Sequence, residues 1–330
     1  MSEVYFKNVD ELRGIIFSLL KKQGLQAVDM HFHSNHSVDG LSSIKDIIKK
    51  CRKDGIGTSI TDHNQISGAL KAKRLSGKGV FIVPGIELTC HNGVHVLLHF
   101  SDIKEYKEFY QKELKARVKK NPWFLDKDHH EMIDIAHNYN CLITAPHPYG
   151  PGFIGIRKFK SNLKTVRKID AVEVINGCLV GKMNPKAIEW AKEMKKGFTG
   201  GSDGHSVKEL GNAVTICQAQ TAEEFLEQIR KRKSIVIGKQ ERILDDAINN
   251  YHKFKHEKKV IPRDVRKKMM KDRRHLEWSY LKNKVKEKDF LHHYHSHHQE
   301  PKKTWLEKHP HTKHLVDKVR KKKDKSESKK

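Results

Sequence analysis

Short apolar runs alternate with stretches of helical periodicity from about residue 27 to residue 238, and this alternation limits the fold more than any other feature. The runs predict strands at 27–32, 57–61, 80–88, 94–100, 141–145, 171–175, 197–201, 213–216 and 234–237. Between them, apolar residues recur at helical spacing, as at Ile44, Ile47 and Cys51. A regular exchange of strands and helices predicts an α/β fold with a largely parallel sheet or a barrel.

The pattern ends near residue 240. Beyond it no strand is predicted, and Pro262, Pro301 and Pro310 interrupt basic, helix-prone segments. The stretch HHYHSHH at 292–298 and the ending RKKKDKSESKK are biased in composition. We therefore predict three parts: an α/β barrel over 1–240, a basic helical extension over 241–290, and a flexible tail rich in His and Lys over 291–330.

The chain is strongly basic, with a formal net charge of +26 from 66 Lys and Arg against 40 Asp and Glu. Residues 241–330 contribute 28 of the basic and 14 of the acidic residues, so this part is the most basic per residue. Such an excess favours polyanionic partners: nucleic acid, nucleotides or an anionic membrane surface. Aromatic residues such as Trp278 and Tyr280 lie among the basic ones, which suits single-stranded nucleic acid; the alternative is a solvated helical extension.

The five cysteines are scattered and contain no CxxC pair. This pattern argues against a disulfide framework and fits a reducing compartment. The first residues show no charged-then-apolar leader, and no apolar run approaches the roughly 18 residues of a membrane span. We therefore predict a cytoplasmic protein without a membrane span.

Histidines and carboxylates recur where the predicted strands end. His31 and His33 lie two residues apart, so both imidazoles point to the same face of the first strand. Later strand ends and loops add Asp39, Asp62, His63, Glu87, His147, Asp203 and His205, while His95 lies near a strand start. Active sites of α/β barrels are built at the carboxyl ends of several strands. These donors exceed what one metal ion requires, so the pattern predicts a centre with more than one divalent ion. Imidazole and carboxylate suit Zn, Mn or Fe better than Mg alone.

Two of these positions have alternatives. His36 can replace Asp39 as a ligand, and His91 or His99 can replace His95. Three further histidines lie in a helical stretch, where we expect them to be structural or exposed: His129, His130 and His137.

The motifs DMHFHSNHSVDG, ITDHN, GIEL, HVLLHF, APHPYG and GGSDGH, in this order, closely resemble the polymerase and histidinol phosphatase (PHP) domain. The later segment from EVING to NAVTI is similar to bacterial PHP phosphoesterases related to nucleotide phosphatases and 5′–3′ exonucleases. The resemblance covers roughly residues 27–238. It implies a distorted seven-stranded (β/α)7 barrel with three divalent metal ions, for which Mn, Zn and Fe are the candidates.

Carried over by position, the resemblance assigns nine residues to three ions. The first ion would be held by His31, His33, Glu87 and Asp203. Glu87 would bridge to a second ion shared with His95 and His147, and the third ion would be held by Asp39, His63 and His205. The region 101–140 is predicted helical and looks shorter than the insertion that helps cover the substrate in many exonuclease-like relatives.

The resemblance implies a metal-dependent phosphoesterase in which a metal-activated water attacks the phosphate ester. We predict that His205, or a water on the third ion, protonates the leaving group and that Asp62 orients its neighbour. Basic residues predicted to contact the phosphate are Arg157, Lys158 and Lys182. The expected substrate is a nucleotide or single-stranded nucleic acid, as for a 5′–3′ exonuclease or a nucleoside-bisphosphate phosphatase. The alternatives are a small-metabolite phosphatase of the histidinol-phosphatase type and a nucleic-acid-binding protein that keeps the barrel as a scaffold.

Overall fold

The computed structural model describes residues 2–239 except 7, 8, 78, 121, 152, 153, 159–162 and 180, and in addition Arg263, Lys267, Lys271 and Arg274. All of these residues belong to one compact unit, Met1–Trp278. The predicted extension 241–290, apart from those four residues, and the predicted tail 291–330 lie outside the described residues. Within the described part of the chain, no helix is both long and apolar enough to cross a membrane.

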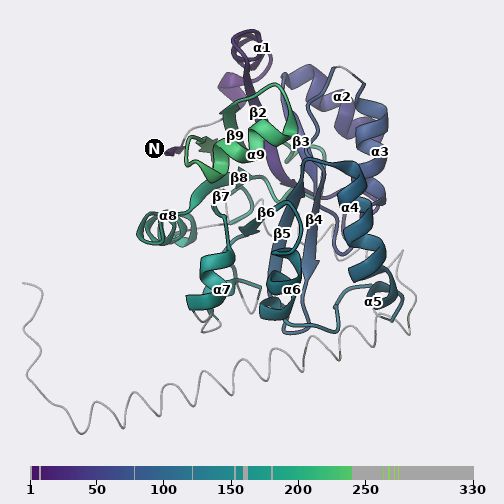
Figure 1. Cartoon of the computed structure of the whole chain (residues 1–330). Coiled ribbons are helices and arrows are strands. Elements are labelled where there is room, and N and C mark those ends of the chain that lie inside the picture. The colour runs from purple at the N-terminus through teal and green to yellow at the C-terminus, as the bar shows by residue number, and fades with distance from the viewer. Residues whose placement is uncertain are drawn as a thin grey trace, which may run out of the picture. The chain divides into compact units, whose positions relative to one another are not determined.

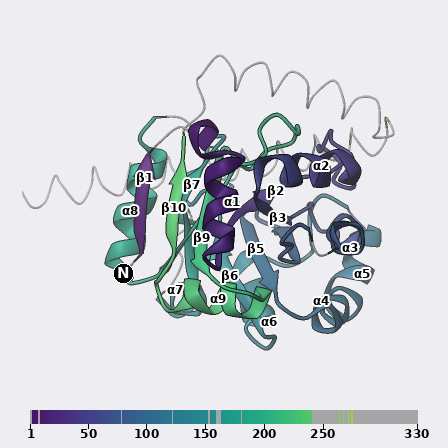
Figure 2. The same cartoon turned by 90° about the horizontal axis from the view of Figure 1, so that it is seen from above.

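Two five-stranded sheets organise the described residues (Figure 1). In order across the sheet, the first contains β1 (Glu3–Phe6), β10 (Ile235–Gly238), β9 (Ala213–Gln218), β2 (Leu25–Phe32) and β3 (Gly57–Ile60). The second contains β4 (Gly85–Thr89), β5 (His95–Phe100), β6 (Cys141–Ala145), β7 (Ala171–Asn176) and β8 (Gly197–Gly201). Figure 2 shows the helices around these strands, with α1 (Ile15–Lys22) packed on β2, α8 (Met183–Glu193) on β7 and α9 (Ala222–Arg230) on β9.

The other helical segments connect the strands. They are η1 (Val9–Leu12), α2 (Ile44–Asp54), α3 (Ser67–Ser76), α4 (Ile103–Phe109), η2 (Tyr110–Leu114), α5 (Lys115–Lys120), α6 (His129–Ala136), η3 (Ile156–Lys158) and α7 (Leu163–Lys168). In α2, the predicted apolar face is buried, and the side chain of Ser43 caps the first turn by accepting a hydrogen bond from Asp46 N. The amphipathic pattern read from the sequence is therefore confirmed for α2.

Both sheets are mixed, whereas the sequence predicted a largely parallel arrangement. Strands β2 and β3 pair in parallel, as do β6, β7 and β8, but β5 and β9 are antiparallel to both of their neighbours. Between β4 and β5 the reason is the short connection, a hairpin in which Cys90 N donates to Val94 O at 3.0 Å. A parallel connection needs a crossover of about a dozen residues or more.

The predicted strands agree with the structure to within two residues at each end, with two exceptions. The predicted strand 80–88 begins only at Gly85, because Ile82 makes a single bridge to Thr58. The sequence did not predict β1, whose side chains alternate poorly: Tyr5 and Phe6, on opposite faces, are 44% and 49% exposed. A strand without a buried face has no period-2 signal.

Isolated bridges join the two sheets at both seams. His63 pairs with Glu87 and Thr58 with Ile82 beside β3 and β4, and Phe32 pairs with Gly204 beyond β8. Because these are single bridges rather than ladders, the described residues form two sheets and no closed barrel. The predicted α/β fold is confirmed, and the seven-stranded barrel stays a prediction.

Candidate metal centre

The predicted ligands come together where strands of both sheets end. His31 lies in β2 with His33 directly after it, and Glu87 lies in β4. His95 is the first residue of β5 and pairs with Thr89, the last residue of β4. Because β5 is antiparallel, its amino end lies beside the carboxyl ends of its neighbours. The position of His95 at a strand start, which was the exception in the sequence pattern, therefore brings it to the same end.

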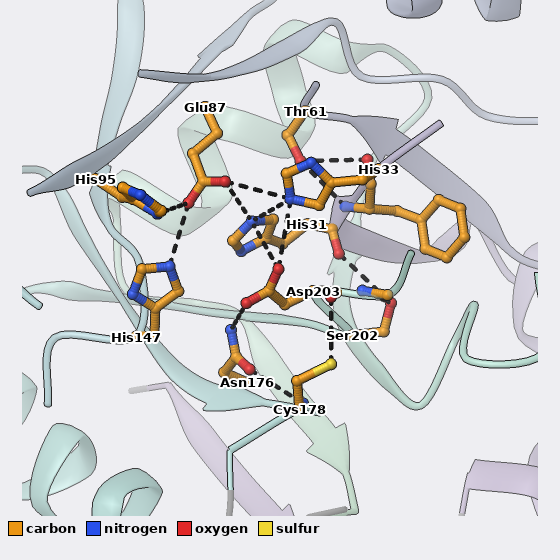
Figure 3. A network of polar contacts seen from close by, with 12 residues as sticks. His31, His33, Thr61, Glu87, His95, His147, Asn176, Cys178, Ser202 and Asp203 are labelled. Atoms are coloured by element: carbon orange, nitrogen blue, oxygen red, sulfur yellow. Dashed lines mark hydrogen bonds and ion pairs between the residues drawn. The ribbon is translucent and has the colours of Figure 1, made fainter. Parts of the chain in front are cut away.

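The carboxylate of Glu87 is 1% exposed and lies in the middle of the cluster (Figure 3). Its Oε2 atom is 3.2–3.3 Å from nitrogen atoms of three imidazoles, those of His31, His33 and His63. Its Oε1 atom is 2.9–3.2 Å from nitrogen atoms of two others, those of His95 and His147. One carboxylate thus divides its two oxygens between two sets of imidazoles.

Three donor atoms of the cluster, from His31, His33 and Asp203, have the spacing of ligands of one metal ion, and Glu87 Oε2 has this spacing relative to both histidines. The Nε2 atoms of His31 and His33 are 3.2 Å apart, and each is 3.2–3.5 Å from Glu87 Oε2 and Asp203 Oδ1. Ligands about 2.0–2.1 Å from a tetrahedral ion are about 3.3–3.4 Å from each other, so these residues fit such an ion. Hydrogen bonds alone do not account for this convergence, because a ring nitrogen carries at most one proton.

The remaining donors form groups that share members with the first. Donor atoms within 4.8 Å of one another are offered by the sets His33, Asp39, His63 and His205; His63, Glu87 and His95; and His31, Glu87 and His147. Asp39 Oδ2 is 2.9 Å from His205 Nε2 and 3.4 Å from His63 Nε2. Buried imidazoles and carboxylates in these numbers suit divalent ions of the Zn, Mn or Fe type.

The structure separates the alternative ligands left open by the sequence. His36 Nδ1 is 2.9 Å from Ser67 Oγ, and His36 belongs to none of the donor groups. His91 is exposed, and His99 Nε2 donates to Met30 O at 2.9 Å. Among the described residues, Asp39 and His95 are therefore the members of these pairs that lie in the cluster.

Glu173, in the middle of β7, contacts two ligands and was missed in the sequence analysis. Its Oε1 atom is 3.0 Å from His31 Nδ1, and its Oε2 atom accepts from His147 N at 2.8 Å. Asn176 Nδ2 donates to Asp203 Oδ2 at 3.1 Å (Figure 3). It also donates to Glu173 Oε2 at 2.9 Å. The available signal was a carboxylate inside the otherwise apolar strand AVEVIN, since a buried charge needs partners.

Two other buried carboxylates hold loops. Asp29 accepts from Ser202 N at 2.9 Å and from Gly211 N at 2.8 Å. Both oxygens of Asp62 accept from Ser34, one from its N at 2.6 Å and one from its Oγ at 2.8 Å. Burial raises the pKa of Asp29 and of Asp62 to about 6, because these hydrogen bonds offset only part of the desolvation. Asp62 thus holds the loop that follows His33, and its predicted role of orienting its neighbour stays a prediction.

Charge interactions control protonation inside the cluster. Burial favours neutral Glu87, but interactions with the surrounding imidazoles outweigh it and hold the pKa of Glu87 well below its usual range. Burial opposes the charge on His33, yet hydrogen bonds with Asp203 and Glu87 raise its pKa to about 10. Burial lowers the pKa of His95 to about 4. Protons compensate the carboxylates when no ion is bound, and a metal ion would replace them.

Two ligands have backbone conformations that are uncommon outside glycine. The φ angle is 26° at His147 and 51° at Asp203. Such conformations cost about 1–3 kcal/mol each and cluster at functional sites. Close packing next to Asp203 requires a glycine: a Cβ atom on Gly201 would lie 2.4 Å from His31 Cβ.

Two of the basic residues predicted to contact phosphate, Arg157 and Lys182, are exposed. Arg157 is exposed, with its guanidinium 5.2 Å from the ring centre of Trp190 and its Nε donating to Tyr149 Oη at 3.4 Å. The loop that carries it is fixed to β5, because His95 N donates to Ile154 O at 3.1 Å. Lys182 is exposed before α8, and the side chain of Lys158 lies outside the described part of the chain.

The three histidines predicted to be structural or exposed lie outside the donor groups. His129 is buried, with its Nδ1 2.7 Å from Asn92 Nδ2. His130 Nδ1 is 2.6 Å from Thr165 Oγ1, and His137 is exposed.

Comparisons with known proteins agree with the resemblance seen in the motifs. Residues 181–234 match a family model described as PHP-associated. An uncharacterised protein of Methanocaldococcus jannaschii is 28% identical over 190 residues, which are 56% of this chain and 68% of that protein.

Two solved structures have a similar fold. One is a two-domain protein of Bacteroides vulgatus that contains a predicted PHP-like metal-dependent phosphoesterase, with 19% identity, a TM-score of 0.50 and coverage of 65% of each chain. The other is a lesion-specific endonuclease of Pyrococcus furiosus, with 18% identity and a TM-score of 0.52, covering 64% of this chain and 57% of that one. This chain thus spans less than two thirds of either structure, and at these identities the likeness concerns the fold. The resemblance to the PHP domain is therefore confirmed: residues 181–234 match the PHP-associated model, and the fold is like that of a solved protein containing a predicted PHP-like phosphoesterase.

Proposed function

We propose that this protein is a metal-dependent phosphoesterase whose active site is the cluster around Glu87. The observation that carries the proposal is the division of one buried carboxylate between five imidazoles, three at Oε2 and two at Oε1. A carboxylate shared in this way suits neighbouring divalent ions, and paired ions are typical of enzymes that hydrolyse phosphate esters.

We propose three ions and nine ligands, with Mn, Zn and Fe as candidate metals. The ligand sets are His31, His33, Glu87 and Asp203 for the first ion; Glu87, His95 and His147 for the second; and Asp39, His63 and His205 for the third. The donor groups support parts of this division: His31, His33 and Asp203 form one group, and Asp39, His63 and His205 form another together with His33. His95 and His147 fall in separate groups that share Glu87.

When bound, the ions would polarise the phosphoryl oxygens and lower the pKa of an attacking water. The residues of the chain hold and orient this site. His205 Nδ1 donates to Asp203 O at 2.8 Å, and Nε2 donates to Asp39 Oδ2 at 2.9 Å in the metal-free protein. To act as a ligand, Nε2 would exchange this proton for the ion. The predicted role of His205 as proton donor to the leaving group requires Nε2 to carry the proton.

In the proposal, Arg157 binds the phosphoryl group as it approaches. Its stacking on Trp190 and its hydrogen bond to Tyr149 orient an exposed guanidinium next to the loop after His147. A planar guanidinium matches two phosphate oxygens at once, which an ammonium group does not.

The proposed substrate is a nucleotide or single-stranded nucleic acid. The net charge of +26 and the fold shared with a lesion-specific endonuclease support this choice. The basic residues of 241–330 are proposed to bind the polynucleotide backbone. Deleting 241–330 should then leave hydrolysis of a mononucleotide largely intact and weaken binding of single strands more at low salt than at high salt. Equal affinity for single strands with and without 241–330 would contradict this part.

The test of the function is a hydrolysis panel with Mn-loaded protein. The substrates are a 5′-labelled oligonucleotide, a nucleoside 3′,5′-bisphosphate and histidinol phosphate, and the control is Glu87→Gln protein. Hydrolysis of the first or second by the unaltered protein, with loss in Glu87→Gln, supports the proposal. Preference for histidinol phosphate supports the small-metabolite alternative. Full metal content with no hydrolysis of any substrate refutes the phosphoesterase proposal and favours the scaffold alternative.

The proposal also includes a distorted barrel of strands β2 to β8. The support is the pair of seams, where single bridges join β3 to β4 and link Phe32 to Gly204 beyond β8. Each seam lies next to ligands, His63 and Glu87 at one and His33 and Asp203 at the other. Because only single bridges hold the strand ends at these seams, their positions can adjust to the bound ions.

A further inference from the structure

A tryptophan beside the cluster has no role in the chemistry described so far. The ring centre of Trp123 is 5.1 Å from that of His63, with 48° between the planes, and the ring of His63 is 5.0 Å from that of His95. Trp123 is half-buried. Side-chain exposure is 14% for His95 against 5% for His63. Trp123 and His95 therefore flank His63 on a side of the cluster that solvent reaches.

The position of Trp123 is set by Asn64, the last residue of the TDHN motif. Asn64 Nδ2 donates to Trp123 O at 2.9 Å and to Pro122 O at 3.2 Å. Asn64 is fully buried and has a φ angle of 51°, in the left-handed region that Asn adopts more readily than most other non-glycine residues. The motif that supplies His63 thus also supports Trp123.

The end of β4 ties these groups together. Thr89 N donates to Asn64 Oδ1 at 3.0 Å, and Thr89 Oγ1 is 2.9 Å from His63 Nδ1. Leu125 N donates to Thr89 O at 3.0 Å, so the chain on the far side of Trp123 is held by the same residue. Trp123 is therefore fixed relative to His63 at both of its ends and offers a preorganised surface.

We propose that Trp123 is a specificity-determining residue: its ring packs against the base of the substrate and selects phosphate esters that carry one. This inference rests on the proposed function, because it takes the cluster as the phosphate site. A phosphate bound at the cluster would place the group esterified to it near the ring of Trp123, because that ring contacts the proposed ligand His63. The indole has a large aromatic face, and nucleobases of any sequence stack on such faces.

The test compares two ligands, adenosine 5′-monophosphate and inorganic phosphate, by calorimetry on the Mn-loaded full chain. Their affinity ratio isolates what the nucleoside contributes. Trp123→Ala should lower this ratio between about fivefold and about a hundredfold, the range of base–aromatic stacking, and Trp123→Phe should lower it less. The control is Tyr139→Leu, which removes a ring from the same connection between β5 and β6, where Tyr139 packs on Phe109 at 5.1 Å between ring centres, and the ratio should not change.

An unchanged ratio in Trp123→Ala overturns the proposal, as does unaltered protein that binds the nucleotide no more tightly than phosphate. If Trp123→Ala protein loses metal because His63 shifts, Trp123→Phe keeps a ring there, and its ratio must still fall. Failure of the proposed function gives a different result: nucleotide binding that depends on Trp123, in a protein that hydrolyses no phosphate ester.

Discussion

His31 Nδ1 lies 3.0 Å from Glu173 Oε1, although 142 positions separate the two residues in the chain. The second oxygen of Glu173 accepts from the backbone of His147. A carboxylate behind a histidine sets which ring nitrogen carries the proton and aims the other nitrogen at the ion. In this structure the aimed atom is His31 Nε2, which is 3.3 Å from Glu87.

Glu173→Gln tests this support. The change keeps the shape of the side chain but removes the charge, so the affinity for Mn²⁺ or Zn²⁺ should fall by about 10- to 100-fold. A competition titration against a chromogenic chelator measures the affinity. The matched control is Asp134→Asn, which neutralises an exposed carboxylate paired with Lys168 and should leave the affinity as it is. Equal affinities for Glu173→Gln and unaltered protein would show that Glu173 does not support the site.

Gly201→Ala should displace His31 through a clash with its backbone and Cβ. The added Cβ would lie 2.4 Å from His31 Cβ and 2.5 Å from His31 N, and the rigid backbone there leaves no room to yield. We expect a loss of about 1–3 kcal/mol in the free energy of unfolding, together with reduced metal content. Urea unfolding and elemental analysis measure the two effects. Gly79→Ala is the control, because the nearest atom to its added Cβ would be Arg52 Nε, 3.4 Å away in a flexible side chain. Equal losses of stability and metal in both variants would rule out a specific effect at His31.

The stability of the metal-free protein should fall as the pH rises above neutral. The pKa of His33 is about 10 in the folded protein against an ordinary value of 6.5. A raised pKa contributes stability that is complete below about pH 6.5 and is lost as the pH rises towards 10. The pKa values of Asp29 and Asp62 are raised to about 6, so these two residues change the stability only below about pH 6. We expect a lower Tm at about pH 9 than at about pH 7.

The Mn-loaded protein provides the comparison for that experiment. An ion takes the place of the protons, so the Tm of the loaded protein should fall less over the same range, and metal binding should release protons. A metal-free Tm that is constant or rises between neutral and alkaline pH would contradict the assignment of bound protons to the cluster.

His95→Ala and His91→Ala should separate the histidines that surround the β4–β5 hairpin. His95 Nδ1 is 2.9 Å from Glu87 Oε1, whereas His91 is exposed. The first change should lower the number of ions bound per chain and reduce phosphoesterase activity by at least about 10-fold, as loss of a ligand does. The second should change neither quantity. Elemental analysis after gel filtration gives the ion count, and normal metal content in His95→Ala would exclude His95 as a ligand.

Asp39→Asn and His36→Ala form a second pair. Asp39 Oδ2 is 2.9 Å from His205 Nε2, whereas His36 Nδ1 bonds Ser67 Oγ. Loss of the carboxylate should weaken one ion by about 10-fold or more without unfolding the chain, while His36→Ala should bind metal normally. A stepwise chelator titration resolves the ion that is affected. The opposite ranking of the two variants would make His36 the ligand.

Much of the architecture could be predicted from the sequence because the relevant signals are local. Apolar runs marked most strands within two residues, and the helical face of α2 followed from its spacing. The strand β1 escaped detection because Tyr5 and Phe6 are both exposed and leave no alternation to read. The direction of β5 was missed, although the five residues between the predicted strands 80–88 and 94–100 are too few for a parallel crossover.

The sequence by itself determined the order of the strands and helices and the chemistry of the cluster: which imidazoles and carboxylates follow which strand. Only the tertiary structure decided that Glu87 divides its oxygens between two sets of histidines, that antiparallel pairing brings His95 to the site, and that Glu173 and Trp123 lie beside ligands. The physical reason is the difference in sequence separation between the two kinds of signal. Periodicity and residue type act over a few positions, whereas these contacts depend on the pairing register of strands far apart in the chain, which is set by the packing of the whole core.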